Sequence, residues 1–359
     1  MKIFMDNIAF SLQKAGGISV YLTELINRML LNNVDVEFIE QNKSQSNIFR
    51  KTLSLPPARI RKQGLLPLSL IRYLPVRIGS NDRAVFHSSY YRTCSSSKIA
   101  NVITVYDFVY EHLESGLSKY VHCKQKLHAI SNADGIICIS ENTKNDLMKY
   151  CKNIDQKKIK VIYLAASNEF HQLVDYDGTG AGSIFDNLTM NKLVIFIGSR
   201  SSYKNFDVAV ATVQKLFGYT LAIVGGNSLS KDELLLLEKE LPGRYVYLGK
   251  VDNRLLNLLY NRAFCLLYPS SYEGFGIPVL EAIQAGCPVV TTNRSSIPEV
   301  CGEAGLMAEN ICPDELAGLI KLLERESFRE QTIKLGIEQA GKFTWDKTYD
   351  ETMEFYCQI

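Results

Sequence analysis

The sequence predicts an α/β fold made of two doubly wound parallel sheets in series, and three observations lead to it. The chain has 359 residues, more than one ordinary core accommodates when a domain averages roughly 150 residues. Short apolar runs alternate with helix-like segments, as in parallel strands that are covered on both faces. This alternation stops at residues 167–191, a stretch rich in glycine and aspartate, and then begins again.

The first half opens with a strand-like segment, residues 2–6. A loop through AGGIS follows, and residues 20–31 then show helical apolar spacing. Further strands are predicted at VDVEFIE, AVFHSS, NVITVYD, GIICIS and KVIYLA. We therefore assign residues 1–166 to a first Rossmann-like domain.

Residues 167–191 are interpreted as a linker, and residues 192–344 as a second Rossmann-like domain. Its predicted strands are LVIFIGS, YTLAIVGG, YVYLGK, FCLLYPS and PVVTT. Residues 345–359 form a final helix capped by Thr344. Ligands of such sheets bind at the carboxyl ends of the strands, so the two sheets are expected to face each other across a ligand-binding cleft.

Composition excludes several classes of function. A net charge of +2 gives no indication of nucleic-acid binding. The nine cysteines are scattered without a C-x-x-C pair, which favours reduced thiols in a cytoplasmic protein. Asp6 interrupts the N-terminus before a signal-peptide core could form, and no apolar run approaches the ~20 residues of a membrane span.

The stretch YEGFGIPVLEA, residues 272–282, carries the clearest chemistry. It follows a predicted strand, and Gly274 and Gly276 allow a tight turn before a helix that starts near Pro278. The unpaired amides of that first helical turn form an anion site. Glu281, on an apolar helix, needs hydrogen-bond partners such as two ribose hydroxyls; the alternative is a helix-dipole contact or an internal salt bridge.

A second anion site is predicted in GSRSSYKNFD, which also joins a strand to a helix. Arg200 and Lys204 flank the turn, and Asn205 is a plausible helix cap. Two fixed cations beside a helix N-terminus suit a diphosphate; the alternative is that both are solvated surface charges. AGGIS is a third candidate, which is weak alone because it is not G-x-G-x-x-G.

The chain resembles the retaining glycosyltransferases of family 4, which have the GT-B fold. GSRSSYKN, LAIVGG, YLGKV and PSSYEGFGIPVLEAIQAGCPVVTTNRSSIPEV resemble the C-terminal half of that family, including its E-x7-E pattern at Glu273 and Glu281. GGISVY, FHSSYY, TVYDF and ADGIICISENTKNDL resemble the N-terminal half. The resemblance is most specific over residues 190–300 and loosest over residues 40–85. It implies that the first domain binds the acceptor and the second domain the nucleotide sugar. It also implies that the final helix, residues 345–359, crosses back to the first domain.

The resemblance implies roles for individual residues. Arg200 and Lys204 would hold the donor diphosphate, and Glu281 would bind the ribose. Glu273 would face the donor sugar. The remaining implied donor contacts are the amides of Phe275, Gly276 and Ile277, Val251 near the base, and Gly16 and Gly17 at the phosphates.

One position departs from the family pattern. Many relatives have a histidine beside the donor sugar where this chain has Tyr106, which can donate a hydrogen bond but cannot act as an imidazole. Asp107 is the substitute candidate for a catalytic role. His87 ends a strand and either lines the cleft or is a hydrogen-bonded structural histidine.

No metal site and no cofactor are expected. The D-x-D at residues 175–177 lies in the predicted linker, and Arg200 and Lys204 can neutralise the leaving group instead. The predicted reaction is metal-independent, retaining transfer of a hexose from a GDP- or UDP-linked donor. GDP-mannose is slightly favoured by general likeness.

The acceptor implied by the resemblance is a lipid-linked glycan in O-antigen or capsule synthesis, at the inner face of the cytoplasmic membrane. Residues 50–83 contain eight Lys/Arg and one acid among apolar residues, so they either contact an anionic membrane or form a solvated segment. Alternatives are a sugar-nucleotide epimerase of the same architecture, a nicotinamide-dependent oxidoreductase without its usual glycine motif, and a non-catalytic sugar-nucleotide-binding protein.

Overall fold

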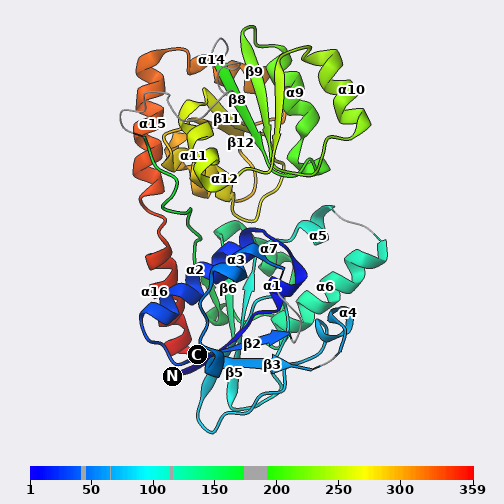
Figure 1. The fold of residues 1–359 in the computed structure, drawn as a ribbon, viewed down its shortest axis with the longest axis vertical. Coiled ribbons are helices and arrows are strands. Elements are labelled where there is room, and N and C mark those ends of the chain that lie inside the picture. Colours follow the sequence, from blue (N-terminus) through cyan, green and yellow to red (C-terminus); the bar gives the residue numbers. More distant parts are fainter. Residues whose placement is uncertain (42–45, 65, 114–115, 174–191) are drawn as a thin grey trace. The chain divides into compact units, whose positions relative to one another are not determined.

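A computed structural model describes residues 1–41, 46–64, 66–113, 116–173 and 192–359. The chain divides into two compact units (Figure 1). Unit 1 consists of residues 1–164 together with 344–359, and unit 2 of residues 165–343. The first part of the predicted linker, residues 167–173, therefore packs with unit 2. The rest of the linker, including the D-x-D at 175–177, lies outside the described residues.

Unit 1 is built on a seven-stranded parallel sheet with the order β3-β2-β1-β4-β5-β6-β7. Strand β1 lies inside the sheet and pairs with β2 on one side and with β4, the central strand, on the other. The strands are β1 (Lys2–Asp6), β2 (Val36–Gln41), β3 (Ile60–Gln63), β4 (Ala84–Ser88), β5 (Ile99–Val105), β6 (Gly135–Cys138) and β7 (Ile159–Val161).

Helices alternate with the strands of unit 1, as the sequence pattern predicts, and one further helix, α16, comes from the end of the described chain. They are α1 (Ile8–Leu12), α2 (Gly17–Leu31), α3 (Ile48–Thr52), α4 (Leu68–Ile71), α5 (Val109–Leu113), α6 (Gly116–Ser131), α7 (Glu141–Tyr150) and α16 (Trp345–Gln358). Short 3-10 turns lie at Pro57–Arg59 and Gln156–Lys158. Among the described residues, no helix combines the length and the apolarity needed to cross a bilayer.

Unit 2 contains a six-stranded parallel sheet with the order β10-β9-β8-β11-β12-β13. Its strands are β8 (Lys192–Ile197), β9 (Tyr219–Val224), β10 (Tyr245–Gly249), β11 (Cys265–Tyr268), β12 (Val289–Thr292) and β13 (Gly305–Ala308). Its helices are α9 (Phe206–Gln214), α10 (Lys231–Glu240), α11 (Asn253–Arg262), α12 (Ile277–Gln284), α13 (Ile297–Cys301), α14 (Pro313–Leu322) and α15 (Glu326–Ala340), with 3-10 turns at Ser202–Lys204 and Gly302–Ala304.

The final helix, α16, belongs to unit 1 although it follows unit 2 in the chain (Figure 1). The Thr344 side chain caps it by accepting a hydrogen bond from the Lys347 amide, as predicted. Trp345 is buried against Tyr21 of α2, with ring centroids 6.4 Å apart. Thr348 donates a hydrogen bond to the Tyr163 carbonyl at 2.7 Å. These contacts bury one face of the helix.

Three elements differ from the sequence predictions. A short helix, α1, occupies part of the region expected to be only loop after the first strand. Strand β3 was missed because its residues, IRKQ, resemble the rest of the basic region. It is an edge strand, and among the described residues it pairs with β2 alone. Strand β13 was missed because only three apolar residues follow Gly305 before Glu309 ends the run.

Candidate donor-binding site

Arg200 follows strand β8 in unit 2, and protein groups hold its guanidinium on several sides. Its Nε donates to Glu233 Oε1 at 2.8 Å, and its Nη2 donates to the Ser228 carbonyl at 3.1 Å. The side chain is only 5% exposed. Arg200 is therefore not the solvated surface charge that the sequence left open.

The Nη1 atom of Arg200 is buried without a hydrogen-bond partner in the part of the chain that the structure describes. A buried unpaired donor on a cation is costly, and a phosphate oxygen is the type of acceptor that would satisfy it. Gly226, after strand β9, makes room for this atom: a Cβ there would lie 2.6 Å from Arg200 Nη1. Gly226 also has φ +69°, which favours glycine.

Lys204 lies at the end of the same connection and is 9% exposed. Its ammonium donates to the Tyr268 hydroxyl at 2.8 Å and forms an ion pair with Glu273. It therefore joins the segment after β8 to the segment after β11. Asn205 occupies the N-cap position of α9 but makes no capping bond; its amide donates to the Pro269 carbonyl instead.

The turn that contains Glu273 is held by two serines from the loop after β12. The Glu273 amide donates to Ser295 Oγ at 2.8 Å, and Ser296 Oγ donates to the carbonyls of Glu273 and Phe275 at 3.0 and 2.9 Å. Gly276 is the N-cap of α12 with φ +103°, and Ile277 is the first helical residue. The predicted strand, glycine turn and helix are thus present, and the backbone amides that follow the turn form the first turn of α12.

Glu281 lies on α12, and the Tyr260 hydroxyl donates to its Oε2 at 3.4 Å. Burial raises the pKa of the Glu281 carboxyl to about 7, against the opposing effect of the Tyr260 hydrogen bond. The side chain retains some exposure to solvent, which moderates this effect. No salt bridge involves Glu281 among the described residues. An incoming pair of hydroxyl donors would therefore stabilise its ionised form.

The predicted residues of unit 2 follow three strands of one parallel sheet. Arg200 and Lys204 follow β8, Val251 lies between β10 and α11, and Glu273 follows β11. Because parallel strands end at the same edge, these segments share one edge of the sheet. The role of Val251 near the base stays a prediction.

In unit 1, the AGGIS segment forms the start of α2. Gly16 is the N-cap, and its carbonyl accepts hydrogen bonds from Ser19 and Val20 at 3.0 and 3.2 Å. A Cβ on Gly16 would lie 2.9 Å from Gln13 Oε1, so the backbone here passes close to a side chain. Gly17 is the first helical residue. Phosphate contact by either glycine stays a prediction.

Tyr106 and Asp107 follow strand β5. The Tyr106 side chain is 7% exposed and packs edge-to-face on Tyr21 at 6.1 Å, so its hydroxyl lies in the interior of unit 1. Asp107 Oδ1 accepts a hydrogen bond from the Val109 amide at 3.1 Å, and its carbonyl accepts one from Lys126 at 2.9 Å. Catalytic roles for these two residues stay predictions.

His87 is a structural histidine. The ring is fully buried, and its nitrogens are hydrogen-bonded to Tyr356 of α16 and, at 2.8 Å, to Thr104 of β5. Burial lowers the pKa of His87 to about 3, so the ring is neutral at physiological pH. The sequence left two roles open for His87, and the structure shows the one of a hydrogen-bonded structural histidine.

Sequence reasoning missed several residues that shape the site. Tyr268 and Glu233 hold Lys204 and Arg200, and Gly226 accommodates the guanidinium. Only Gly226 carried a usable signal, since a Gly-Gly pair directly after a predicted strand marks a close backbone approach. The partners of the two cations lie 33 and 64 residues away in the chain, and no local pattern predicts such pairs.

Comparisons with known proteins match both units. The sequence profile described as "Glycosyltransferase Family 4" matches residues 15–167, and the one described as "Glycosyl transferases group 1" matches residues 184–342. Together they cover most of the chain. The chain belongs to glycosyltransferase family 4.

Relatives of this family 4 chain include the O-antigen chain mannosyltransferase B of Escherichia coli, which is 29% identical over 244 residues. That match covers 66% of the chain and 64% of the relative's own length. An uncharacterised glycosyltransferase of Methanocaldococcus jannaschii, MJ1178, is 21% identical over 100% of the chain and 99% of its own length.

Solved structures establish the GT-B fold of this family 4 chain. Anabaena HepE in complex with UDP and glucose matches with a TM-score of 0.75 at 15% identity, over 100% of both chains. WaaG, a glycosyltransferase involved in lipopolysaccharide biosynthesis, matches with a TM-score of 0.68 at 16% identity, over 99% of both chains. The predicted fold class is therefore confirmed.

Proposed function

We propose that this chain transfers a hexose from a nucleotide diphosphate sugar to a hydroxyl group of a lipid-linked glycan, with retention of configuration and without a metal ion. One observation carries the proposal: the buried Arg200 guanidinium, with its unpartnered Nη1, lies on the connection that ends in Lys204. Two cations fixed by protein partners suit a diphosphate, whose negative charge increases as the sugar leaves.

The remaining residues of the site fit the other parts of the donor. The amides at the start of α12, around Gly276 and Ile277, supply further anion contacts. Glu281 accepts hydrogen bonds from the ribose hydroxyls. Glu273, held by Lys204 and Ser295, lies near the sugar. The leaving diphosphate accepts the acceptor's proton on the face from which it departs, so the protein supplies orientation and charge stabilisation.

Mannose is the proposed sugar, and GDP the proposed nucleotide. The support comes from relatives that are named as O-antigen and serotype-specific mannosyltransferases, at 29% and 25% identity. HepE, whose crystal structure is a complex with UDP and glucose, is more distant in sequence at 15% identity. A panel of both nucleotides and their sugars therefore tests the assignment directly.

A surface of unit 1 supports the lipid-linked acceptor and contact with an anionic membrane. Leu70 and Tyr73, from the predicted basic region, are about half exposed, as are Leu113 and Tyr120 of α5 and α6. Tyr73 and Tyr120 line the same cavity, of about 480 Å³, together with Lys124. Exposed apolar and aromatic side chains beside a lysine are typical of a surface that meets lipid.

Some basic residues of the 50–83 region already have protein partners, which makes them weaker candidates for membrane contact. Arg59 donates to the Val34 carbonyl, and Arg61 forms an ion pair with Glu37, so both already have protein partners. Arg72 packs over the rings of Tyr73 and Tyr90. The apolar surface around Tyr73 and Tyr120 is therefore a sharper target for mutation than Arg59 and Arg61.

The donor part of the proposal is tested with Arg200→Ala combined with Lys204→Ala. Ligands that bind only the folded protein raise the melting temperature. We expect GDP-mannose to raise it in the wild type and not in the double variant, and sugar transfer to be abolished. Lys215→Ala, which removes an exposed lysine paired with Asp314, is the control. Full transfer by the double variant contradicts the proposal.

The acceptor part is tested by co-sedimentation with vesicles that contain anionic phospholipid. Tyr73→Ser with Tyr120→Ser should reduce the bound fraction, and neutralising Arg59, Arg61 and Arg72 should have a smaller effect. Phe217→Ser, which removes a fully exposed aromatic ring from unit 2, is the matched control. Equal binding by all variants rejects membrane contact while leaving donor binding untouched.

A further inference from the structure

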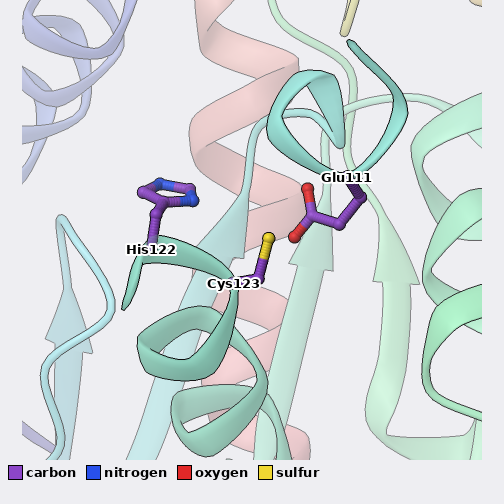
Figure 2. Close-up of side chains that lie close together, drawn as sticks. All are labelled: Glu111, His122 and Cys123. Carbon is purple, nitrogen blue, oxygen red and sulfur yellow. The ribbon is translucent and has the colours of Figure 1, made fainter. Parts of the chain in front are cut away.

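Three side chains of unit 1 with metal-binding atoms lie together outside the donor-binding residues. Glu111 comes from α5, and His122 and Cys123 are consecutive residues of α6. One ligand atom from each lies within 4.8 Å of the other two. Figure 2 shows the Glu111 carboxylate and the Cys123 sulfur directed toward each other, with the His122 ring beside them.

Two of the three groups lack the partners that buried polar atoms normally have. Within the described ranges, Glu111 Oε1 and His122 Nδ1 are buried with no hydrogen-bond partner. The Glu111 side chain is only 6% exposed. An unpaired buried carboxylate oxygen costs free energy, and a cation that accepts its lone pair would remove that cost.

Neighbouring groups hold the Glu111 and His122 side chains in place. The Lys126 ammonium, itself fully buried, lies 2.7 Å from Glu111 Oε2 and thereby leaves Oε1 available. The Tyr110 ring stacks on His122 with centroids 4.0 Å apart and an interplanar angle of 19°. Outer contacts of this kind orient metal ligands in known sites.

We propose that Glu111, His122 and Cys123 form a binding site for a divalent ion of the zinc class. Carboxylate, imidazole and thiolate are all zinc ligands, and three protein ligands leave a fourth tetrahedral position open for water. Metal bonds of about 2.0–2.3 Å place ligand atoms roughly 3.5 Å apart, so modest side-chain rotation closes the observed spacing.

The protonation states are consistent with this assignment. Burial, with Lys126 and Arg72 nearby, lowers the pKa of His122 to about 4, so its ring offers a lone pair at neutral pH. Burial and the Glu111 carboxylate raise the pKa of the Cys123 thiol. Binding must therefore displace the thiol proton: Cys–SH and M²⁺ give Cys–S⁻–M²⁺ and H⁺.

The bound ion would connect α5 to α6 and so restrain the segment that begins at Asp107. This role is structural and separate from sugar transfer. Lys126 and Arg72 oppose a cation, and the carboxylate and the thiolate offset them. We therefore expect moderate affinity and stabilisation of unit 1, with no requirement for the ion in turnover.

Cobalt(II) is the probe, because a cobalt–thiolate bond gives a charge-transfer absorption band in the near ultraviolet. The wild-type chain should bind one Co²⁺ with this band, and Zn²⁺ should displace it with release of about one proton. Cys123→Ser should abolish the band. Glu111→Gln and His122→Asn should each weaken binding by at least about tenfold.

The matched controls are Cys312→Ser, another half-buried thiol, and His128→Gln, an exposed histidine of the same helix. Both should retain the band, and zinc should raise the melting temperature of these controls but not that of Cys123→Ser. A band that survives Cys123→Ser, or the absence of saturable Co²⁺ binding by the folded wild type, overturns the proposal. Either result leaves the proposed sugar transfer unaffected.

Discussion

The ammonium of Lys204 lies 2.5 Å from the carboxylate of Glu273, and this ion pair joins the connections that follow β8 and β11. Both side chains are nearly buried, at 11% and 12% exposure. Tyr268 accepts a further hydrogen bond from the same ammonium. The cation is therefore oriented before any ligand arrives, and it can stabilise developing charge without first reorganising.

Replacing this cation should impair turnover strongly. For Lys204→Met we expect sugar transfer to fall by about a hundredfold or more, because one preorganised charge contact is lost from the reacting diphosphate. Steady-state kinetics of the variant and of the exposed-site control Lys215→Met provide the measurement. Turnover within a few-fold of the wild type would show that Lys204 serves only to hold Glu273.

Gly226 provides a test of Arg200 that leaves the arginine in place. Gly226→Ala should displace the guanidinium, since the new Cβ would meet Nη1 at 2.6 Å, and donor affinity should fall about tenfold or more. Gly218→Ala is a matched control: its φ is +75°, close to the +69° of Gly226, but its Cβ would meet no atom of the described residues within 4 Å. Both variants should lose roughly 1 kcal/mol of stability from backbone strain. Equal donor affinity in the two variants would contradict the placement of Arg200.

Glu281 should make stability depend on pH in a defined direction. The pKa of its carboxyl in the folded protein, about 7, lies above the ordinary value of 4.5. The stability that the neutral carboxyl contributes is therefore fully present below pH 4.5 and is lost as pH rises through 7. Glu281→Gln removes this dependence. From pH 4.5 to 8 the variant should gain on the order of 1–3 kcal/mol relative to the wild type, at the lower end because the side chain is partly exposed.

Urea unfolding of both proteins at several pH values measures this difference. Nucleotide affinity provides a second readout: ribose hydroxyls favour the ionised carboxylate, so wild-type affinity should rise through pH 7 while that of Glu281→Gln stays flat. A free-energy difference between the two proteins that is the same at pH 5 and pH 8 would rule out the raised pKa.

Tyr356 links α16 to His87 in the core of unit 1. Tyr356→Phe leaves a buried imidazole nitrogen without its partner and should cost about 1–3 kcal/mol of stability. Tyr245→Phe, which removes a hydroxyl that donates to exposed Glu238, should cost much less. Urea unfolding measures both. If the two variants lose the same stability, the His87 contact does not hold α16 in place.

The sequence predicted the two sheets well because the buried strands read as continuous apolar runs. It also placed Arg200, Lys204, Glu273 and Glu281 after β8 and β11, since glycine turns between strand and helix are local signals. Strand β3 escaped prediction because edge strands often carry charged side chains, and Arg61 and Lys62 hide its strand pattern. The Lys204–Tyr268 contact escaped for a different reason: it joins residues 64 positions apart.

The cluster of Glu111, His122 and Cys123 is a clearer example of a contact that the sequence alone does not predict. Adjacent residues of a helix point in different directions, so His122 and Cys123 give no ligand-spacing pattern along the chain. Their convergence depends on where α5 lies against α6, which is a property of the packed unit. The sequence identified Tyr106 as an unusual residue for its position, but it could not predict that Tyr106 is buried against Tyr21.

The return of α16 to unit 1 means that the second unit is inserted, in sequence, within the first. During synthesis the ribosome delivers β1–β7, then all of unit 2, and only afterwards the helix that covers His87 and Tyr21. The apolar face of unit 1 that α16 covers thus stays exposed while unit 2 is already complete and able to fold. Chaperone demand and the time of greatest aggregation risk should coincide with that interval.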